Sequence, residues 1–531
     1  MSSPIPALVS VRGARRLPRP ALLLLGAAYL LPGLFGREPW RNADLAAFGQ
    51  MAAIAEGRSG WLTPTLGGVA GDTALLPHWL GAVAIQVLSS WIEAPLAARL
   101  AFALLLALTL LLTWGATYHL ALTDAAQPLP FAFGGEAEPT DYARAIADGA
   151  TLALMATLGL LRLGHETTPE LAQLAAVALL AYALASAPFR RWQPRAAVLL
   201  ALPLLAGSGA PVMALVMGLG GLEVCRRSAY EPVRAFVRWI AAAVALSALL
   251  ATALGGWHWR AEAPTAADAW AIPRQWLWFM WPAWPLALWT LWRWRRFVGH
   301  RHLAVPLVLA AAALLANLVM AGSDRALLLG LPGLAILAAF ALPTLQRSAA
   351  AAIDWFSMCF FTGGAIAVWV IYSSMQLGAP AKPAANVARL APGFEPVFSL
   401  PALAAAVAGT LAWLWLIRWR TGRHREALWK SLVLPAGGVA LCWLLVMTLL
   451  LPPLDYGLSN RPLAQRLSAH VPPGGCIAAP GASPAHVATL EHYGRWRVDA
   501  TPAADQGRCD TLVKVVRGKP WSPPPGWDLV A

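Results

Sequence analysis

Two aspartates occupy positions at which a carboxylate could act in catalysis. Asp44 opens the stretch 44–57, where apolar residues recur at spacings of three and four, so we expect it at the start of a short helix. Asp148 directly precedes a long apolar stretch and shares one helical face with Asp141 and Arg144. A carboxylate at the end of an apolar span is costly unless it is hydrated, paired or functional. Both aspartates are therefore candidates for general acid–base chemistry.

Structural roles would explain the same two residues. Asn42 or Asp44 can cap the helix, and a carboxylate in the first turn interacts favourably with the helix dipole. An ion pair between Arg144 and Asp148 would account for the second carboxylate equally well. The residues alone leave both interpretations open.

Further polar residues lie at the ends of apolar segments, and they could contribute to a binding site. The pair His165-Glu166 receives no role, because counting the spans places it on the opposite side of the membrane. Neither a Cys/His metal spacing nor a Gly-rich phosphate loop nor a nucleophile elbow occurs, so the motifs name no cofactor. The binding candidates are Asp72 and His78 at the second span, and His258, Arg260 and Glu262 after the seventh.

The composition decides which elements must position these residues. The 531 residues include 40 Lys and Arg against 26 Asp and Glu, which gives a net charge of +14, and 58% are hydrophobic but only 12% charged. This charged share is about half of the ~25% usual in soluble proteins. A cytosolic enzyme, a secreted disulfide scaffold and a disordered chain are therefore excluded. The 27 Trp suit the membrane interface, and we predict an all-α polytopic membrane protein.

We expect about thirteen membrane-spanning helices, each of ~20 mostly apolar residues. The first follows a basic N-terminus and lacks an Ala-x-Ala cleavage site, so it is interpreted as an uncleaved anchor. The predicted spans lie near 20–36, 76–92, 97–121, 149–163, 171–188, 196–222, 237–256, 275–292, 302–321, 326–344, 353–377, 399–417 and 431–452.

Basic residues concentrate in short loops, which favours a cytoplasmic location for 12–19, 226–238, 293–301 and 418–430. This distribution reflects the orientation of the chain in the membrane, so nucleic acid is not an expected partner. The loops 37–75 and 122–148 are then external, and the first is expected to carry an amphipathic helix along the membrane face. One basic loop disagrees, because Arg190, Arg191 and Arg195 fall outside. Either 149–188 contains an incomplete span, or the sequence 207–211 breaks 196–222 into two helices.

The tail 455–531 has the composition of a soluble domain, and an odd span count exports it. Its pattern indicates strand, helix, strand and strand at 476–479, 485–493, 496–499 and 511–516, a small α/β domain. Cys476 and Cys509 lie in this tail, where a disulfide could persist, although two unpaired thiols remain the alternative. Two domains are thus expected, 1–454 in the membrane and 455–531 outside it.

Several motifs resemble the integral-membrane (GT-C type) glycosyltransferases of the aminoarabinose-transferase and protein-mannosyltransferase type. The similarity begins with Pro39-Trp40 followed by Asp44, continues through Gly60-Trp61-Leu62-Thr63-Pro64 and includes a later acidic motif at 143–148. The stretches 74–79 and 97–100 also resemble the family's motifs, as does an exported domain after about thirteen spans. The sequence departs from the pattern at Ala43, where the family has a first acidic residue.

The resemblance implies transfer of a sugar from a polyprenyl-phosphate carrier to a lipid, glycan or protein acceptor at the external face of a bacterial inner membrane. It implies that Asp44 is the base and that Asp148 orients the acceptor, holds a divalent cation or shares the base role. The N-terminus would be cytoplasmic and the C-terminal domain periplasmic. The residues expected to bind substrate are Arg41, Asp72, His78, Asp141, Arg144, His258 and Arg260.

Two other functions compete with this interpretation. A non-catalytic protein of envelope assembly, descended from such a transferase, would fit the substitution at Ala43. A transporter would predict inverted repeats and ionisable residues at mid-membrane, whereas the charged residues here gather at span ends.

Overall fold

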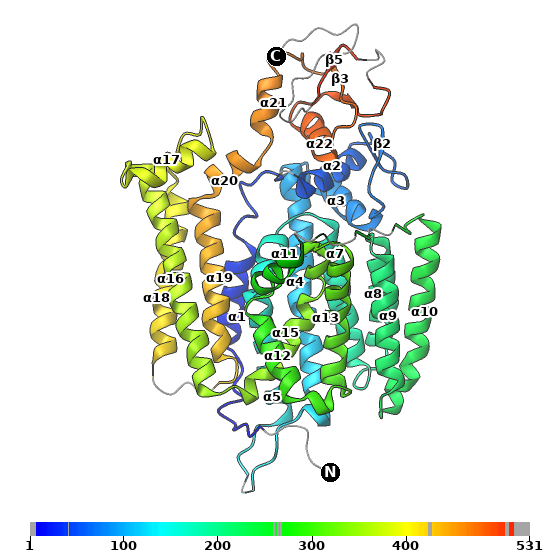
Figure 1. Ribbon diagram of the computed structural model, residues 1–531, viewed down its shortest axis with the longest axis vertical. Helices are drawn as coiled ribbons and strands as arrows, with labels where there is room; N and C mark the ends of the chain where they lie inside the picture. Colours follow the sequence, from blue (N-terminus) through cyan, green and yellow to red (C-terminus); the bar gives the residue numbers. More distant parts are fainter. Residues whose placement is uncertain are drawn as a thin grey trace.

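The fold is that of a polytopic helical membrane protein with a small α/β part at its C-terminus (Figure 1). The computed structural model describes residues 7–40, 42–132, 134–258, 261–262, 265, 268–422, 427–504 and 509–514. The helices of the bundle are α1 (Arg19–Leu30), α4 (Ala94–Ala121), α5 (Pro139–Ala156), α6 (Leu158–Leu163), α7 (Pro169–Ser186), α8 (Gln193–Gly207), α9 (Pro211–Arg226), α10 (Glu231–Ala253), α11 (Asp268–Phe279), α12 (Ala283–Arg293), α13 (Arg301–Val319), α14 (Asp324–Leu328), α15 (Leu331–Ala341), α16 (Arg347–Leu377), α18 (Leu400–Thr421) and α19 (Lys430–Leu449).

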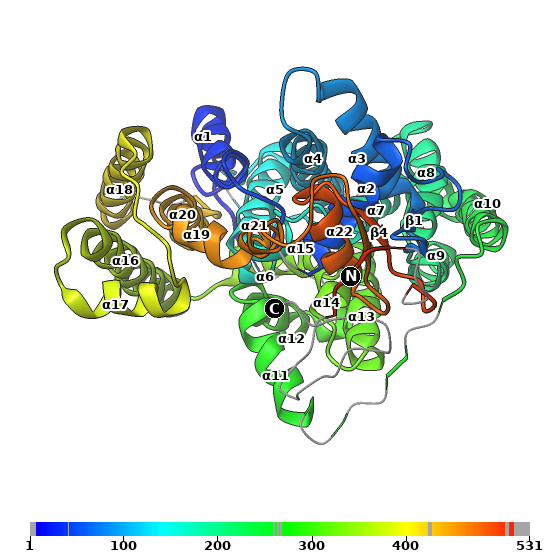
Figure 2. The same cartoon turned by 90° about the horizontal axis from the view of Figure 1, so that it is seen from above.

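The remaining elements lie at one end of the bundle, the upper end in Figure 1, and the N-terminus lies at the other. They form three structures: the 37–75 segment, a short helix after α16, and the C-terminal part. Figure 2 shows the C-terminal part over the middle of the bundle, with α8–α10 on one side and α16–α18 on the other. These elements are α2 (Ala43–Ala55), β1 (Thr65–Leu66), β2 (Val69–Ala70), α3 (Leu75–Leu88), α17 (Ala381–Leu390), α20 (Leu451–Leu458), α21 (Arg461–Leu467), β3 (Cys476–Ala478), α22 (Pro484–His492), β4 (Arg497–Asp499) and β5 (Thr511–Leu512).

Apolar composition accounts for the bundle. Within the described residues, seven helices are long and apolar enough to cross a membrane, and shorter apolar helices pack beside them. Alanine-rich faces let the helices approach closely, as is usual where lipid replaces water around a bundle. The seven are α4, α7, α10, α13, α16, α18 and α19.

Two predicted spans differ from the structure. One of them does not cross the bundle and the other is two helices, so the number of predicted membrane spans is unchanged. The segment near 76–92 is the short helix α3, which lies beside α2 at the upper end instead of crossing. The segment 196–222 is two helices, α8 and α9. Gly209 turns the chain between them with φ of 85°, a conformation that glycine adopts without strain, and Pro211 starts α9.

The prediction that 122–148 lies on the same side of the membrane as the 37–75 loop is wrong. Leu129 and Ala137 donate backbone hydrogen bonds to Ala7 and Val9, so the loop pairs with the N-terminal segment. Both lie at the lower end of the bundle, opposite the C-terminal part (Figure 1). This correction also moves Arg190, Arg191 and Arg195 to the end that carries the other basic loops.

The helix predicted in the 37–75 segment forms at Ala43–Ala55, but almost every one of its residues is buried. Its surroundings explain this burial, because α3 packs on it from one side and α22 from another. The helix is therefore an internal element of the upper end and has no extended surface along the membrane.

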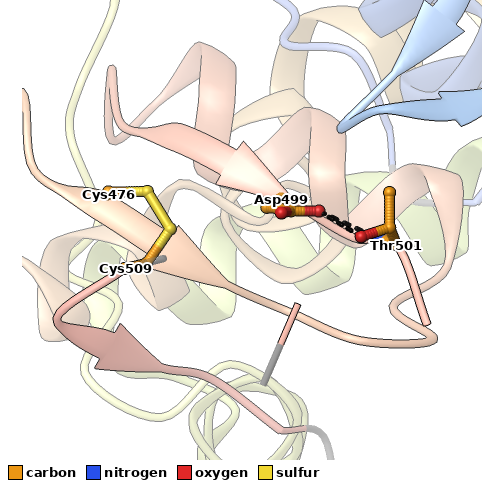
Figure 3. The surroundings of a disulfide bond; sticks show 4 residues. All are labelled: Cys476, Asp499, Thr501 and Cys509. Atoms are coloured by element: carbon orange, nitrogen blue, oxygen red, sulfur yellow. Dashed lines mark hydrogen bonds between the residues drawn. A yellow bond between two sulfur atoms is a disulfide. The ribbon is translucent and has the colours of Figure 1, made fainter. Parts of the chain in front are cut away.

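The C-terminal part forms the expected strand, helix, strand and strand. Its three strands make a parallel sheet in the order β4-β3-β5, with Cys476 opposite Arg497 and Ile477 opposite Thr511. Cys476 and Cys509 are joined by a disulfide with their Cα atoms 4.9 Å apart (Figure 3). Nearby, Asp499 accepts hydrogen bonds from the backbone and hydroxyl of Thr501.

Candidate functional site

The carboxylate of Asp44 lies at the centre of a buried hydrogen-bond network at the upper end of the bundle. It is 3% exposed. One oxygen accepts bonds of 2.7 Å from the backbone N–H and from the hydroxyl of Thr167. The other accepts from the Arg37 guanidinium at 3.0 Å and from the Trp40 backbone at 3.1 Å. Asp44 thus ties together the chain entering α2 and the turn that precedes α7.

Arg99, in the first turns of α4, supports this network from below. Its guanidinium donates to the carbonyl oxygens of Leu34, at 2.6 Å, and of Arg37. It therefore fixes the end of the segment that follows α1, and with it the position of Arg37. Arg99 belongs to the Ala-Ala-Arg-Leu stretch noted in the sequence, which acquires a structural explanation here.

Glu166 lies next to this network and forms an ion pair with Arg325 at the start of α14. The two charged atoms are 2.6 Å apart. Arg325 also bonds Glu170 and the hydroxyl of Thr168, each at 3.0 Å. Because Glu166 is adjacent to Thr167, the two carboxylates of Asp44 and Glu166 share one region of the protein.

The environment moves the pKa values of these two acids in opposite directions. Burial tends to raise the pKa of Asp44, but the Arg37 charge and the hydrogen bonds from Thr167 and Trp40 outweigh it, so the pKa lies below its usual 3.8. Burial raises the pKa of Glu166 above its usual 4.5; the nearby Arg325 lowers it in part, and the Asp44 charge raises it further. Glu166 is therefore the better proton acceptor of the pair.

A hollow of about 330 Å³ opens between α6, α11 and the start of α14. Apolar side chains form much of its wall, among them Leu158, Trp278 and Phe279. Arg162, Arg274 and the carboxylate of Asp324 also line it, and neither arginine forms an ion pair within the described part of the chain. The charge of Arg162 reaches Glu166, since it lowers the pKa of that acid. The hollow therefore combines an apolar surface with two cations and one carboxylate, and one of the cations, Arg162, acts on the half-buried Glu166.

The prediction that Asp44 and Asp148 meet in one pocket is wrong. Asp148 accepts hydrogen bonds from the backbone of Leu17, at 2.8 Å, and from the Trp114 indole, at 2.9 Å. Leu17 belongs to the N-terminal segment at the lower end, so the two aspartates are separated by the bundle (Figure 1). Asp148 anchors that segment. The alternative, an ion pair between Asp148 and Arg144, also does not form, because Arg144 bonds the exposed Asp141 instead, at 3.1 Å.

The other predicted binding residues divide into three groups. His78 is 1% exposed, and burial lowers its pKa to about 4 although the charge of Asp72 acts in the opposite direction. Both residues lie at the upper end, where α3 begins. The side chain of His258 is exposed after α10, and no described contact joins it to Asp44 or Glu166. Arg41 and Arg260 lie outside the described residues. Within the described ranges, no three His, Cys, Asp or Glu side chains are grouped so as to hold a metal.

Glu166 is the site residue to which the sequence analysis gave no role. The reason was the count of spans, which placed His165-Glu166 at the wrong end. A signal was present, because the misplaced basic loop at Arg190, Arg191 and Arg195 indicated an error of one span before it.

The C-terminal part covers the entrance to α2 through several contacts. Asp455 of α20 accepts hydrogen bonds from the backbone of Glu38, at 2.9 Å, and from the Trp40 indole, at 3.1 Å. Glu38 in turn accepts from Arg461 and from the Tyr493 hydroxyl. The segment that carries Arg37 and Asp44 is therefore held from both the bundle and the C-terminal part.

These features define a polytopic helical membrane protein with a charged site beneath a C-terminal α/β cap. Among solved structures, the chain is similar to ArnT from Cupriavidus metallidurans bound to undecaprenyl phosphate, with a TM-score of 0.60, 14% identity, and coverage of 91% of this chain and 86% of that one. The same ArnT in the apo state gives a TM-score of 0.56 at 14% identity, covering 90% and 83%. The chain thus shares its fold with these ArnT structures. No family model and no curated protein matches the sequence.

Proposed function

We propose that this protein transfers a sugar from a polyprenyl-phosphate carrier to a lipid, glycan or protein acceptor of the bacterial envelope. The observation that carries the proposal is the hollow between α6, α11 and α14, where Arg162 and Arg274 lie among apolar side chains. The charge of Arg162 also acts on Glu166. An apolar wall suits a carrier tail, and guanidinium groups suit its phosphate. The ArnT structure with undecaprenyl phosphate supports a ligand of this class on the same fold.

In the proposed reaction, an acceptor hydroxyl attacks the anomeric carbon of the sugar. The new bond from the acceptor oxygen to that carbon forms as the bond from the carbon to the phosphate oxygen breaks. The phosphate leaves with the electron pair, and Arg162 and Arg274 stabilise its charge. The acceptor proton passes to Glu166, whose raised pKa suits a general base.

Asp44 takes a positioning role in this proposal. Both of its oxygens already accept hydrogen bonds, and its lowered pKa makes it a weak base. It holds the turn at Thr167 and therefore the position of Glu166. This assignment replaces Asp44 as base and removes Asp148 from the reaction.

We also propose that the upper end faces the periplasm and that the N-terminus is cytoplasmic. With 122–148 at the lower end, all the basic loops of the sequence gather there, as the positive-inside rule requires of a cytoplasmic side. The division into a membrane domain, 1–454, and a periplasmic domain, 455–531, follows from this orientation. A disulfide between Cys476 and Cys509 is consistent with an oxidising compartment.

Mass spectrometry of envelope glycans and lipid carriers, with and without the gene, tests the function. The expected result is loss of one envelope modification together with accumulation of its lipid-linked sugar. Complementation with an Arg162→Gln/Arg274→Gln variant should fail, whereas an Arg238→Gln variant, altered at the opposite end of the bundle, should restore the modification. Unchanged envelope lipids and glycans in the deletion strain would contradict the proposal and favour a non-catalytic role.

A further inference from the structure

A second hollow, of about 300 Å³, lies at the lower end of the bundle, where α7 ends and α8 and α10 begin. It is far from the site described above, which is at the upper end. Its wall combines cations with aromatic rings. The residues that matter here are Phe189, Arg190, Arg191, Arg195, Phe236 and Trp239.

Among the described residues, no carboxylate forms an ion pair with the arginines of this hollow. Within the described ranges, none of Arg190, Arg191 and Arg195 forms an ion pair with a carboxylate. Other arginines at the same end do, since Arg227 bonds Glu223 at 2.5 Å and Arg420 bonds Asp354. The hollow therefore gathers three cations whose charge remains available to an external anion.

Tryptophan rings hold two of these guanidinium groups in place. Arg195 lies 5.1 Å from the ring centre of Trp192 and 5.3 Å from that of Trp239. Arg191 lies 5.7 Å from Trp192. Stacking of this kind orients a guanidinium while leaving its N–H edges free to bind phosphate oxygens. The N-terminus of α8, which has no acidic residue in its first turn, lies at the same place, and its helix dipole adds to the attraction for an anion.

The surroundings indicate what carries the anion. Phe189 is 41% exposed, Trp192 66% and Leu200, two turns further along α8, 57%. Large apolar side chains with this exposure, on helices of a membrane bundle, face lipid. A ligand of the hollow therefore has its charge at the arginines and its apolar body against these side chains.

We propose that this hollow binds the phosphate headgroup of an anionic phospholipid in the membrane leaflet at the lower end. The phosphate oxygens accept hydrogen bonds from Arg190, Arg191 and Arg195, while the acyl chains lie against Phe189, Trp192 and Leu200. Basic pockets between helices at this level of a membrane have the chemistry for such headgroups. This proposal is independent of the sugar transfer proposed above.

Native mass spectrometry of the full-length protein, released from nanodiscs of defined composition, tests the lipid site. Nanodiscs of phosphatidylcholine with phosphatidylglycerol are expected to yield protein that retains phosphatidylglycerol in preference to phosphatidylcholine. An Arg191→Gln/Arg195→Gln variant should retain it roughly tenfold less. Equal retention of both lipids by the unmodified protein would overturn the proposal.

Two matched variants show whether the effect belongs to this hollow. Arg293→Gln/Arg296→Gln removes the same charge from another basic loop at the same end, and Arg162→Gln/Arg274→Gln removes it from the upper hollow. Both variants should retain as much phosphatidylglycerol as the unmodified protein does. If either loses as much as the Arg191→Gln/Arg195→Gln variant, the assignment of the lipid to this hollow is wrong. Competition with inorganic phosphate distinguishes a lipid headgroup from soluble phosphate as the ligand. If millimolar phosphate displaces phosphatidylglycerol, the hollow is a site for soluble phosphate and the lipid assignment is wrong.

Discussion

The carboxylate of Asp44 accepts hydrogen bonds from both the backbone and the hydroxyl of Thr167, a residue 123 positions further along the chain. This contact joins the chain that enters α2 to the turn between α6 and α7. It places Asp44 beside Glu166 in a way that local sequence does not reveal. The position of Glu166, the proposed base, therefore depends on Asp44, both of whose carboxylate oxygens accept hydrogen bonds.

Glu166→Gln should abolish most of the sugar transfer while leaving the fold intact. A general base contributes roughly 10²–10⁴ in rate, so turnover should fall by about that factor. Glu170→Gln is the matched control, because Glu170 bonds the same Arg325 at 3.0 Å. The measurement is transfer of a labelled sugar by purified protein. Equal losses in the two variants would assign the effect to the ion-pair network and leave Glu166 without a role as base.

The acid side of the pH profile should belong to Glu166. The pKa of Asp44 lies below its usual 3.8, so this group stays ionised throughout the range in which the protein can be assayed. The pKa of Glu166 lies above its usual 4.5, so activity should fall as the pH drops through that raised value. Arg325→Gln removes a cation that favours the ionised acid, and kcat/KM should then begin to fall at a higher pH. An unchanged profile in this variant would contradict the assignment.

Thr167→Val should destabilise the protein more than Thr157→Val does. The Thr167 hydroxyl donates to the Asp44 carboxylate, and a bond to a charged group contributes about 1.5–3 kcal/mol. The Thr157 hydroxyl is also buried but donates to a neutral backbone carbonyl, so its loss should cost only about 1 kcal/mol. Thermal unfolding in detergent would compare the two. A larger loss of stability for Thr157→Val would contradict the expectation that the Thr167–Asp44 hydrogen bond is the stronger of the two.

Gly49→Ala should loosen the C-terminal part from α2. A Cβ atom on Gly49 would lie 2.4 Å from the Cβ of Ala488 in α22, which is far closer than two carbon atoms can approach. Ala488→Gly removes the clashing atom, so the double variant should regain the native docking. Limited proteolysis within 455–531 in native membranes measures the effect. Faster cleavage that Ala488→Gly does not correct would show that the clash lies elsewhere.

The cysteines of the C-terminal part test the orientation of the protein. In a variant with Ser at Cys225, Cys359 and Cys442, a membrane-impermeant thiol reagent should label Cys476 and Cys509 in intact spheroplasts after reduction. Without reduction the disulfide should protect them. Labelling that requires lysis would place the upper end in the cytoplasm and would overturn the proposed topology.

Local sequence predicted those features that depend on local composition. Apolar stretches identified most of the bundle, and the periodicity at 44–57 identified α2 because the pattern belongs to one helix. The strand and helix pattern of the C-terminal part was also correct. Sidedness was different, since an error in the span count carries along the chain. Interpreting α3 as a span inverted the loops 122–148, 164–168 and 187–192, until the division of 196–222 into α8 and α9 restored the count. That single error placed Asp148 with Asp44 and put Glu166 on the wrong side. Contacts between distant parts of the chain, such as those of Leu17 with Asp148 and of Thr167 with Asp44, correct it.

The cover over α2 has a consequence for how the protein is made. Glu38 and Tyr493, which are hydrogen-bonded in the finished protein, are 455 positions apart. A ribosome synthesises α2 long before it reaches α22, so this apolar helix must wait uncovered while the whole bundle is inserted. During that interval it is open to misfolding, to proteases and to binding by chaperones. Biogenesis is therefore completed only when α22 has docked on α2, and the contacts of Glu38 with Arg461 and Tyr493 form in that last step.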